Sequence, residues 1–583
     1  MKSNKAIIGL LSMAVVSVVV LYACKKSFLT REPIGQLGDA DVATQKGVEE
    51  LLIGAYAILD GNYNDFNWQA STTNWVFGSI AGGDAHKGSD AGDQADVNPI
   101  ERYESLPTND YYNVKWKATY DGVARSNNVL KALAKADVNE EDRPILRAQA
   151  RFLRGFYHLE AKKMWNKIPY VDESIDYVAN NYKVSNTEDA WPKIEADFKA
   201  AYDSLPALMG QVGRANKWAA GAFLAKTYMF QKKYAEAKPI LEAIIASGTN
   251  PRGVKYGLET RYQDNYNAET KNGKESVFAV QASVNDGGGG ANSNPGSILN
   301  FPHNSVGAPG GCCGFFQPTQ ELVNSFRTTA TGLPLLDGSY NQGANQVKSD
   351  FGIAATAAFT PDAGPLDPRL DWTVGRRGIP YLDWGPHPGM SWIRDQSNGG
   401  PYSPKKNVYY KSQEKVLTDG SSWTNGLTAI NFILIRYADV LLWAAECEVE
   451  IGSLEKAREY VNMVRERAKN QASWVMNGAN PAANYVIDTY NSAFPDQATA
   501  RRAVHMERKL ELGMEGHRFF DLVRWGEASS TLNAYIAYES TIMGLLRGAK
   551  FTEPKNNYYP IPQRQIDLSA TNGVSALEQN PDY

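Results

Sequence analysis

The chain has 583 residues and a formal net charge of −4, because 64 Asp and Glu nearly balance 60 Lys and Arg. The basic residues form no dense block, so nucleic acid is not expected as a partner. The length suits one large domain with insertions or a few fused domains. Tyrosine and tryptophan are abundant, with 31 and 13 copies, and such rings fill cores or form flat faces for ligands.

An apolar run opens the chain and ends at a cysteine. A basic start followed by the run over residues 6–23 is typical of a signal peptide. A membrane-spanning helix is the alternative, since the run reaches the lower limit of length for crossing a bilayer. The run ends in LYAC, residues 21–24, which resembles the lipobox of bacterial lipoproteins. This resemblance implies that residues 1–23 are removed and that Cys24 carries acyl chains, which anchor the protein without a transmembrane helix.

Helical periodicity appears in four segments, where apolar residues lie three and four positions apart. The predicted pairs are residues 147–165 with 188–206, 218–245, 436–468 and 507–526. Pro239 is expected in the first turn of its helix, because a proline farther along would break the helix. Small residues near the crossings and an aromatic near each turn are typical of tetratricopeptide repeats. The predicted fold class is mainly α, with four tetratricopeptide-like pairs as a scaffold.

Two long insertions, roughly residues 60–120 and 250–430, have the opposite character. They are rich in Gly, Asn, Pro, Asp and Trp, and helical periodicity is nearly absent. A disordered linker would not hold so many tryptophans. Because ligand sites tend to lie on loops carried by a rigid frame, we expect these insertions to form the ligand face.

Three cysteines follow Cys24. Cys447 falls on the apolar face of a predicted helix and is most simply a small buried residue. Cys312 and Cys313 are adjacent in PGGCCGFF, so their Cα atoms would lie about 3.8 Å apart across a trans peptide. This is closer than ordinary disulfides prefer. A bridge between them would be locally rigid and could persist outside the cell, but the sequence leaves open whether it forms.

Motifs along almost the whole mature chain resemble those of the SusD/RagB family of nutrient-binding outer-membrane lipoproteins of Bacteroidetes. The order and spacing of the motifs carry this resemblance. They are SFLTREP after Cys24, KWKATYDGVARSNNVL (115–130), RAQARFLRGFYHLEA (147–161), RYADVLLWAAE with VNMVRERA, RKLELGMEGHRFFDLVRWG (508–526), and YYPIPQRQIDLS with LEQNPDY at the end.

The resemblance implies a SusD-like fold over residues 24–583, anchored in the outer membrane and facing the cell surface. Proteins of this family sit as a lid over a SusC-like TonB-dependent β-barrel transporter. They capture oligosaccharides, or peptides in some members, and pass them into the barrel without breaking bonds.

The sequence shows no motif typical of an enzyme. The six histidines are scattered, and the sequence has no HExxH motif, paired-Cys zinc pattern or nucleophile elbow. A glycosidase pair of carboxylates stays open, because among 64 acidic residues some pair is always close. No cofactor is expected. Calcium is an alternative at the Asp- and Asn-rich residues 84–98, although the EF-hand pattern is absent there.

Sugar binding needs aromatic planes for C–H faces, and carboxylate, amide or guanidinium groups for hydroxyls. The preferred platforms are Trp75 and Trp384, on Gly-rich loops. A disulfide between Cys312 and Cys313 would give the sugar a rigid, polarizable contact. The alternative is that the pair only kinks the chain and has no role in binding. The candidate glycan-binding residues are Asp65, Asn67, Trp75, Asp84, Cys312, Cys313, Arg377, Trp384 and Tyr409.

The leading hypothesis is therefore a lipid-anchored glycan-binding lid for a TonB-dependent transporter. A neutral glycan such as a fructan or glucan is favoured, because the insertions mix both charge signs and show no Arg cluster. A peptide-capturing relative of the same fold, a surface glycoside hydrolase and a structural repeat protein that docks partners are the alternatives.

Overall fold

The computed structural model describes residues 42–583 except 62–66, 177, 305–306 and 421–423. The predicted signal segment, Cys24 and Asp65 lie outside the described residues. Within the described part of the chain, no helix has both the length and the hydrophobicity needed to cross a membrane.

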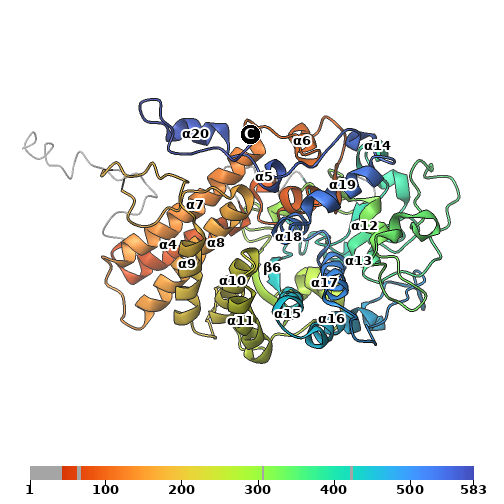
Figure 1. Ribbon diagram of the computed structural model, residues 1–583, viewed down its shortest axis with the longest axis horizontal. Helices are drawn as coiled ribbons and strands as arrows, with labels where there is room; N and C mark the ends of the chain where they lie inside the picture. The colour runs from red at the N-terminus through yellow and green to blue at the C-terminus, as the bar shows by residue number, and fades with distance from the viewer. Residues whose placement is uncertain (1–41, 62–66, 177, 305–306, 421–423) are drawn as a thin grey trace, which may run out of the picture.

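Long helices form one side of the molecule and irregular chain the other (Figure 1). The first helices lie at the left of the view, and the loop-rich central insertion, with α12, α13 and α14, lies at the right. The long helices are α4 (Gln45–Ala57), α7 (Asp110–Leu133), α8 (Asp142–Trp165), α9 (Trp191–Ser204), α10 (Lys217–Phe230), α11 (Tyr234–Ser247), α15 (Tyr437–Ile451), α16 (Leu454–Lys469), α17 (Gln497–Leu512), α18 (Arg518–Trp525) and α19 (Ala528–Glu539). The shorter ones are α5 (Asn67–Ala70), α6 (Asn98–Glu101), α12 (Gln320–Ser325), α13 (Leu370–Thr373), α14 (Gln396–Gly399) and α20 (Gln563–Ser569). The prediction of a mainly helical fold is confirmed.

Three of the predicted helix pairs are present: α8 with α9, α10 with α11, and α15 with α16. The fourth segment is instead the end of α17 and the whole of α18, separated by a break at residues 513–517. Gly516 in this break has φ +77°, and a Cβ there would lie 2.1 Å from the Thr73 carbonyl oxygen. Only glycine fits such a close approach.

Two details of the helices differ from expectation. The first insertion ends before residue 120, because α7 already begins at Asp110. Pro239 lies inside α11, past its first turn, so its expected place was wrong. The helix continues through this position although proline supplies no amide hydrogen there.

Side-chain caps and aromatic rings explain where the helices begin and how they pack. Thr44 Oγ1 accepts a hydrogen bond from Gly47 N at 3.1 Å at the start of α4, which satisfies an amide that has no partner within the helix. The ring of Phe152 on α8 contacts Phe198 on α9 and Phe223 on α10, with centroids 5.8 and 5.4 Å apart. These rings belong to one continuous core.

Short two-stranded antiparallel sheets tie the insertions to the helices. The pairs are β1 (Ala85–Gly88) with β3 (Phe315–Pro318), β2 (Ser276–Val280) with β6 (Phe432–Arg436), β4 (Val374–Gly375) with β5 (Ser403–Pro404), and β7 (Met476–Asn477) with β8 (Asn480–Pro481). The β2–β6 pair joins the two ends of the central insertion, and β4–β5 closes the base of an excursion over residues 376–402.

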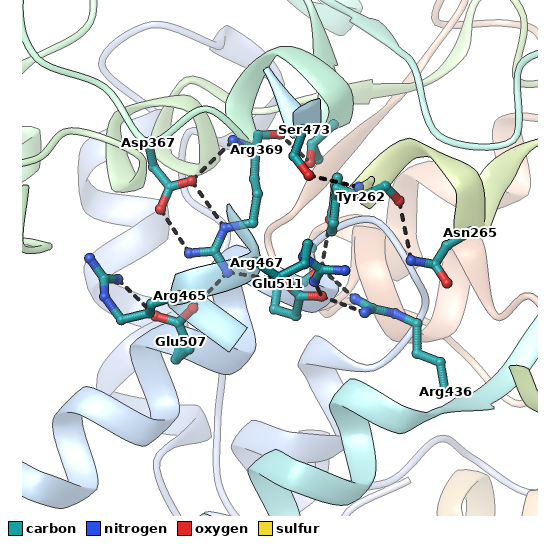
Figure 2. A network of polar contacts seen from close by, with 12 residues as sticks. Tyr262, Asn265, Asp367, Arg369, Arg436, Arg465, Arg467, Ser473, Glu507 and Glu511 are labelled. Carbon is teal, nitrogen blue, oxygen red and sulfur yellow. Dashed lines mark hydrogen bonds and ion pairs between the residues drawn. The ribbon is translucent and has the colours of Figure 1, made fainter. Parts of the chain in front are cut away.

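A buried network of opposite charges holds the insertion against the helices (Figure 2). Glu511 on α17 is fully buried, and its carboxylate accepts hydrogen bonds from Arg369, Arg436 and Arg467. Burial by itself raises the pKa of Glu511, but the three guanidinium groups outweigh burial and hold this pKa well below its usual value. The residue is therefore ionised, with all its charge compensated inside the protein.

The network extends to a second carboxylate of α17. Glu507 accepts from Arg465 Nη1 at 2.9 Å and from Arg369 Nη1 at 2.6 Å. Arg369 also donates two hydrogen bonds to Asp367, at 3.0 and 2.7 Å. Because Asp367 and Arg369 belong to the central insertion, these contacts fix the insertion to the helical scaffold.

Replacing Glu511 with Gln keeps the shape but removes the charge that three buried arginines share. Removing one partner of a buried ion pair costs about 3–5 kcal/mol. We therefore expect Glu511→Gln to lower the free energy of unfolding by about that amount in urea titrations. Glu459, whose ion pair with Lys456 on α16 is half exposed, is the matched control. Glu459→Gln should cost less than about 1 kcal/mol, and equal losses for the two variants would contradict the assignment.

His86 on β1 joins three distant segments. Its Nδ1 lies 2.8 Å from Glu101 Oε1, and its Nε2 lies 3.0 Å from Glu539 Oε1. Glu539 also accepts hydrogen bonds from the backbone amides of Gln320 and Glu321 at the start of α12. Burial lowers the pKa of His86, but the two carboxylates outweigh burial and raise the pKa to about 9.

Stability should therefore depend on the protonation of His86. A pKa raised from 6.5 to about 9 contributes about 3 kcal/mol, at about 1.4 kcal/mol per unit. This contribution is complete below about pH 6.5 and is lost as the pH rises through about 9. The difference in unfolding free energy between wild type and His86→Gln, measured in urea, should shrink by about 3 kcal/mol between pH 6 and pH 10. A difference that does not change with pH would show that the imidazole is not charged in the folded protein.

Candidate functional site

Trp384 lies at the tip of the excursion that β4 and β5 close. A tight turn presents it: Tyr381 N donates to Gly385 O at 2.8 Å, and Gly385 has φ +95°. The indole Nε1 donates to Tyr409 O at 3.1 Å, and the ring packs edge-on against the Tyr409 ring, with centroids 5.7 Å apart. Trp384 stays half-buried, so it is a fixed ring with part of its surface open.

Two charged side chains lie beside this ring. The exposed carboxylate of Asp383 accepts hydrogen bonds from the backbone amides of Lys411 and Ser412. The Lys411 ammonium lies 5.7 Å from the Trp384 ring centroid, a cation–π distance. Sequence reasoning missed Asp383 and Lys411, although each lies within two positions of a predicted site residue.

Tyr409 supports the site from behind. It is fully buried, so the structure gives it no surface for direct contact with a ligand. Its hydroxyl accepts a hydrogen bond from Gly310 N at 2.7 Å, and its ring contacts Phe301 at 5.7 Å. Burial raises the pKa of Tyr409 to about 12, so the hydroxyl stays protonated. Tyr409 thus joins Trp384 to the segment that carries the cysteine pair.

Cys312 and Cys313 are joined in a disulfide. Cys312 is half-buried and Cys313 is buried, with Cys313 N donating to Leu299 O at 3.1 Å. Gly310, just before the cysteines, has φ +69°. Its backbone amide is the group of this segment that bonds to the Tyr409 hydroxyl. We call Asp383, Trp384 and Lys411, with Tyr409 behind them, the Trp384 surface; Cys312 lies two residues after Gly310, whose amide bonds to Tyr409.

Trp75, the other preferred platform, lies in the core. Its side chain is 2% exposed and packs edge-on against Phe315 and Phe316, with centroids 6.1 and 5.9 Å apart. Its Nε1 donates to Trp68 O at 3.0 Å. Burial removes the open face that a platform needs, so Trp75 instead supports the strand that follows the disulfide.

Asp84 is also buried, at 1% exposure. Its Oδ2 accepts hydrogen bonds from Met514 N at 3.0 Å and Ser79 Oγ at 3.2 Å. Burial raises the pKa of Asp84 to about 6. The residue fixes the break between α17 and α18 to the first insertion and does not lie where a ligand hydroxyl reaches it.

Arg377 is 8% exposed, and its guanidinium is used by the chain itself. It donates to the carbonyl oxygens of Ala354, Ala355 and Ala357 at 3.1, 2.8 and 2.6 Å. It therefore shapes the neighbouring loop and is not placed on the Trp384 surface. Asn67 begins α5.

Residues 84–98, considered above for calcium, already enclose a cation. The Lys87 ammonium donates to the carbonyl oxygens of Asp90 and Asp93 at 2.6 and 2.7 Å. Arg394 bonds the side chains of the same two aspartates, at 2.5 and 2.7 Å. These groups use the oxygens that calcium would need. Among the described residues, no group of three or more His, Cys, Asp or Glu is arranged to hold a metal.

Comparison with known proteins identifies the family of the chain. A family model described as "SusD family" matches residues 274–583. The chain belongs to the SusD family. A second model, described as "Starch-binding associating with outer membrane", matches residues 27–229. As a SusD family member the protein is a binding protein and not an enzyme.

Individual relatives are distant in sequence but similar in fold. SusD-like protein P25 of Formosa agariphila is 24% identical over 426 residues, which cover 70% of this chain and 69% of the relative. The structure of a laminarin-binding SusD-like protein superposes with a TM-score of 0.64 at 21% identity, covering 93% of this chain and 100% of that one. Surface glycan-binding protein A of Bacteroides thetaiotaomicron in complex with laminarihexaose gives 0.63 at 21% identity, covering 92% and 99%. The SusD-like fold is thereby confirmed.

Proposed function

We propose that the protein captures a neutral oligosaccharide, with a β-glucan as the first candidate, and delivers it intact to a SusC-like TonB-dependent transporter. The Trp384 surface carries the proposal, because it presents a partly open aromatic ring between an exposed carboxylate and an ammonium group. The match to a starch-binding family model supports a glucan, as do two structures of similar fold, a laminarin-binding SusD-like protein and a surface glycan-binding protein in complex with laminarihexaose.

In this proposal the C–H face of a sugar ring rests on Trp384, and its hydroxyls bond to Asp383 and Lys411. Tyr409 fixes the indole through one hydrogen bond and an edge contact, so little side-chain freedom is lost on binding. The half-buried Cys312 offers a second rigid contact. An importer must release its cargo, so binding spreads over several sugar units and is micromolar or weaker.

The anchor and the transporter complete the proposal. Residues 1–23 would be removed, and the lipid on Cys24 would hold residues 24–583 at the outer membrane, facing the cell surface. The match of residues 27–229 to a family model described as associating with the outer membrane supports this location.

Removing the ring of Trp384 tests the binding surface. Calorimetry of residues 25–583 with laminarihexaose, maltohexaose and inulin fragments should identify one glycan that binds. Trp384→Ala should weaken that binding at least tenfold, about 1.4 kcal/mol, because the sugar loses its apolar platform. Trp218→Ala, which alters a half-buried tryptophan on α10, is the control and should bind like wild type. Unchanged affinity in Trp384→Ala, or nanomolar binding of a monosaccharide, would contradict the proposal.

The disulfide should matter for the same binding. Reduction, or the double change Cys312→Ser and Cys313→Ser, should weaken glycan affinity a few-fold while the far-ultraviolet circular dichroism stays the same, because a rigid contact loosens and the helices are untouched. Cys447→Ala removes the buried free thiol and should respond to reductant as wild type does. An affinity that survives both reduction and substitution would remove the pair from the site.

A further inference from the structure

A groove on the helical side of the protein shares no residue with the Trp384 surface. It has a volume of about 1070 Å³ and lies between the end of α7, α8, residues 170–176 and the start of α9. These helices lie in the left half of Figure 1, away from the central insertion. Among the described residues, six basic and three acidic ones line the groove. This excess of cations indicates an anionic partner.

Most of the cations come from two neighbouring helices. Arg147, Arg151 and Arg154 are four and three positions apart on α8, so they share one face of that helix. Lys131 and Lys135 are four positions apart at the end of α7 and just beyond it. All five line the groove, and the helices therefore form a positively charged wall.

Two of these cations already have carboxylate partners. Arg154 is buried and donates to Asp197 through Nε and Nη2, at 2.9 and 2.8 Å, and it also pairs with Glu173. Arg151 shares Asp197, with Nε to Oδ1 at 2.9 Å. Its Nη1 has no acceptor in the part of the chain that the structure describes. These pairs hold two guanidinium groups in place and leave one donor of Arg151 available.

Arg147 and Lys135 are available in full. Both are exposed, and neither has a hydrogen bond or an ion pair with any described residue. Lys131 bonds only to a backbone carbonyl oxygen, that of Ile175. A guanidinium group can offer two parallel donors to an oxyanion, and an ammonium group acts as a point charge. Because these groups lie on two helices, one ligand can place more than one oxyanion among them.

The loop over residues 172–176 gives the groove an acidic wall. Asp172 Oδ1 accepts hydrogen bonds from Ser174 N and Oγ at 3.0 and 2.5 Å, and Asp176 Oδ1 accepts from Val178 N at 2.8 Å. These carboxylates repel a ligand that carries anions on every side. They accept hydrogen bonds from a ligand that turns neutral hydroxyls toward them. A sugar with ester oxyanions has both kinds of group, whereas the side chains of an acidic peptide offer carboxylates alone.

We propose that this groove, which we call the Arg147 groove, binds a saccharide that carries tetrahedral oxyanions, either sulfate or phosphate esters. The oxyanions lie on Arg147 and Lys135, and hydroxyls face residues 172–176. A tetrahedral ester presents its oxygens in several directions, so donors from two helices can bond to it together. The inference rests on the proposed function, because it adds a charged capture site to a protein that captures a neutral glycan at the Trp384 surface.

The test compares sucrose octasulfate and inositol hexaphosphate with sucrose, in calorimetry on residues 25–583. One of the two anionic probes should bind at least about tenfold more tightly than sucrose, because its contacts are charge-assisted, and the tighter probe identifies the ester. Its affinity should fall at least about tenfold between about 50 and about 300 mM NaCl, because salt screens exposed charges.

Variants place the probe on the molecule. The double change Lys135→Gln and Arg147→Gln should weaken binding of the anionic probe at least about tenfold. Its matched control is Arg502→Gln with Lys550→Gln, which removes the same charges from two exposed positions outside the groove. The control should bind like wild type.

Further arms separate this proposal from the one above and from other ligands. The Lys135→Gln and Arg147→Gln variant should bind the neutral glycan unchanged, and Trp384→Ala should bind the anionic probe as wild type does. Hexaglutamate and inorganic sulfate should each bind at least about tenfold more weakly than the probe. The assignment is overturned if neither anionic probe binds more tightly than sucrose, if the double variant keeps the affinity, if the control or Trp384→Ala loses it, or if hexaglutamate or inorganic sulfate binds as tightly.

Discussion

The fold depends on carboxylates and guanidinium groups that are buried together around α17. Glu511 meets Arg369 of the central insertion, Arg436 at the end of β6 and Arg467 on α16. Such a network gains little net stability over apolar packing, but it leaves an expensive unpaired charge in any arrangement that separates its members. We infer that it sets how the insertion lies on the helices, because each partner comes from a different segment and separating them would leave buried charges unpaired.

This constraint explains how a long irregular segment presents a fixed ring. The excursion over residues 376–402 lies between Arg369 and Lys406, and these two residues are fixed to α17 or to the break that follows it. Lys406 donates to Gly513 O and Glu515 Oε1, each at 2.7 Å. The β4–β5 pair closes the excursion between these anchors. Because this frame already holds the ring in place, little conformational entropy is lost when a sugar binds. A small contact area can then give useful affinity.

The helices could be predicted from the sequence because their apolar spacing is local, whereas the site depended on contacts between distant segments. Trp75 and Trp384 both stand in insertions whose sequence lacks helical periodicity, but the pairing of β1 with β3 brings Phe315 and Phe316 onto Trp75 and buries it. Arg377 could not be distinguished from a ligand contact, because its partners are backbone carbonyls of a loop that has no signature in the sequence. The adjacency of the cysteines was visible in the sequence, but whether the bridge forms was left open until the structure showed the disulfide.

The central claim is that a scaffold fixed by buried charges holds an open indole that binds a glycan without cleaving it. A crystal structure of residues 25–583 soaked with laminarihexaose measures this most directly. We expect an intact chain of sugar units lying across Trp384, with hydroxyls bonded to Asp383 and Lys411. Sugar bound elsewhere with the Trp384 ring uncovered, or shortened glycan fragments in the density, would contradict the account.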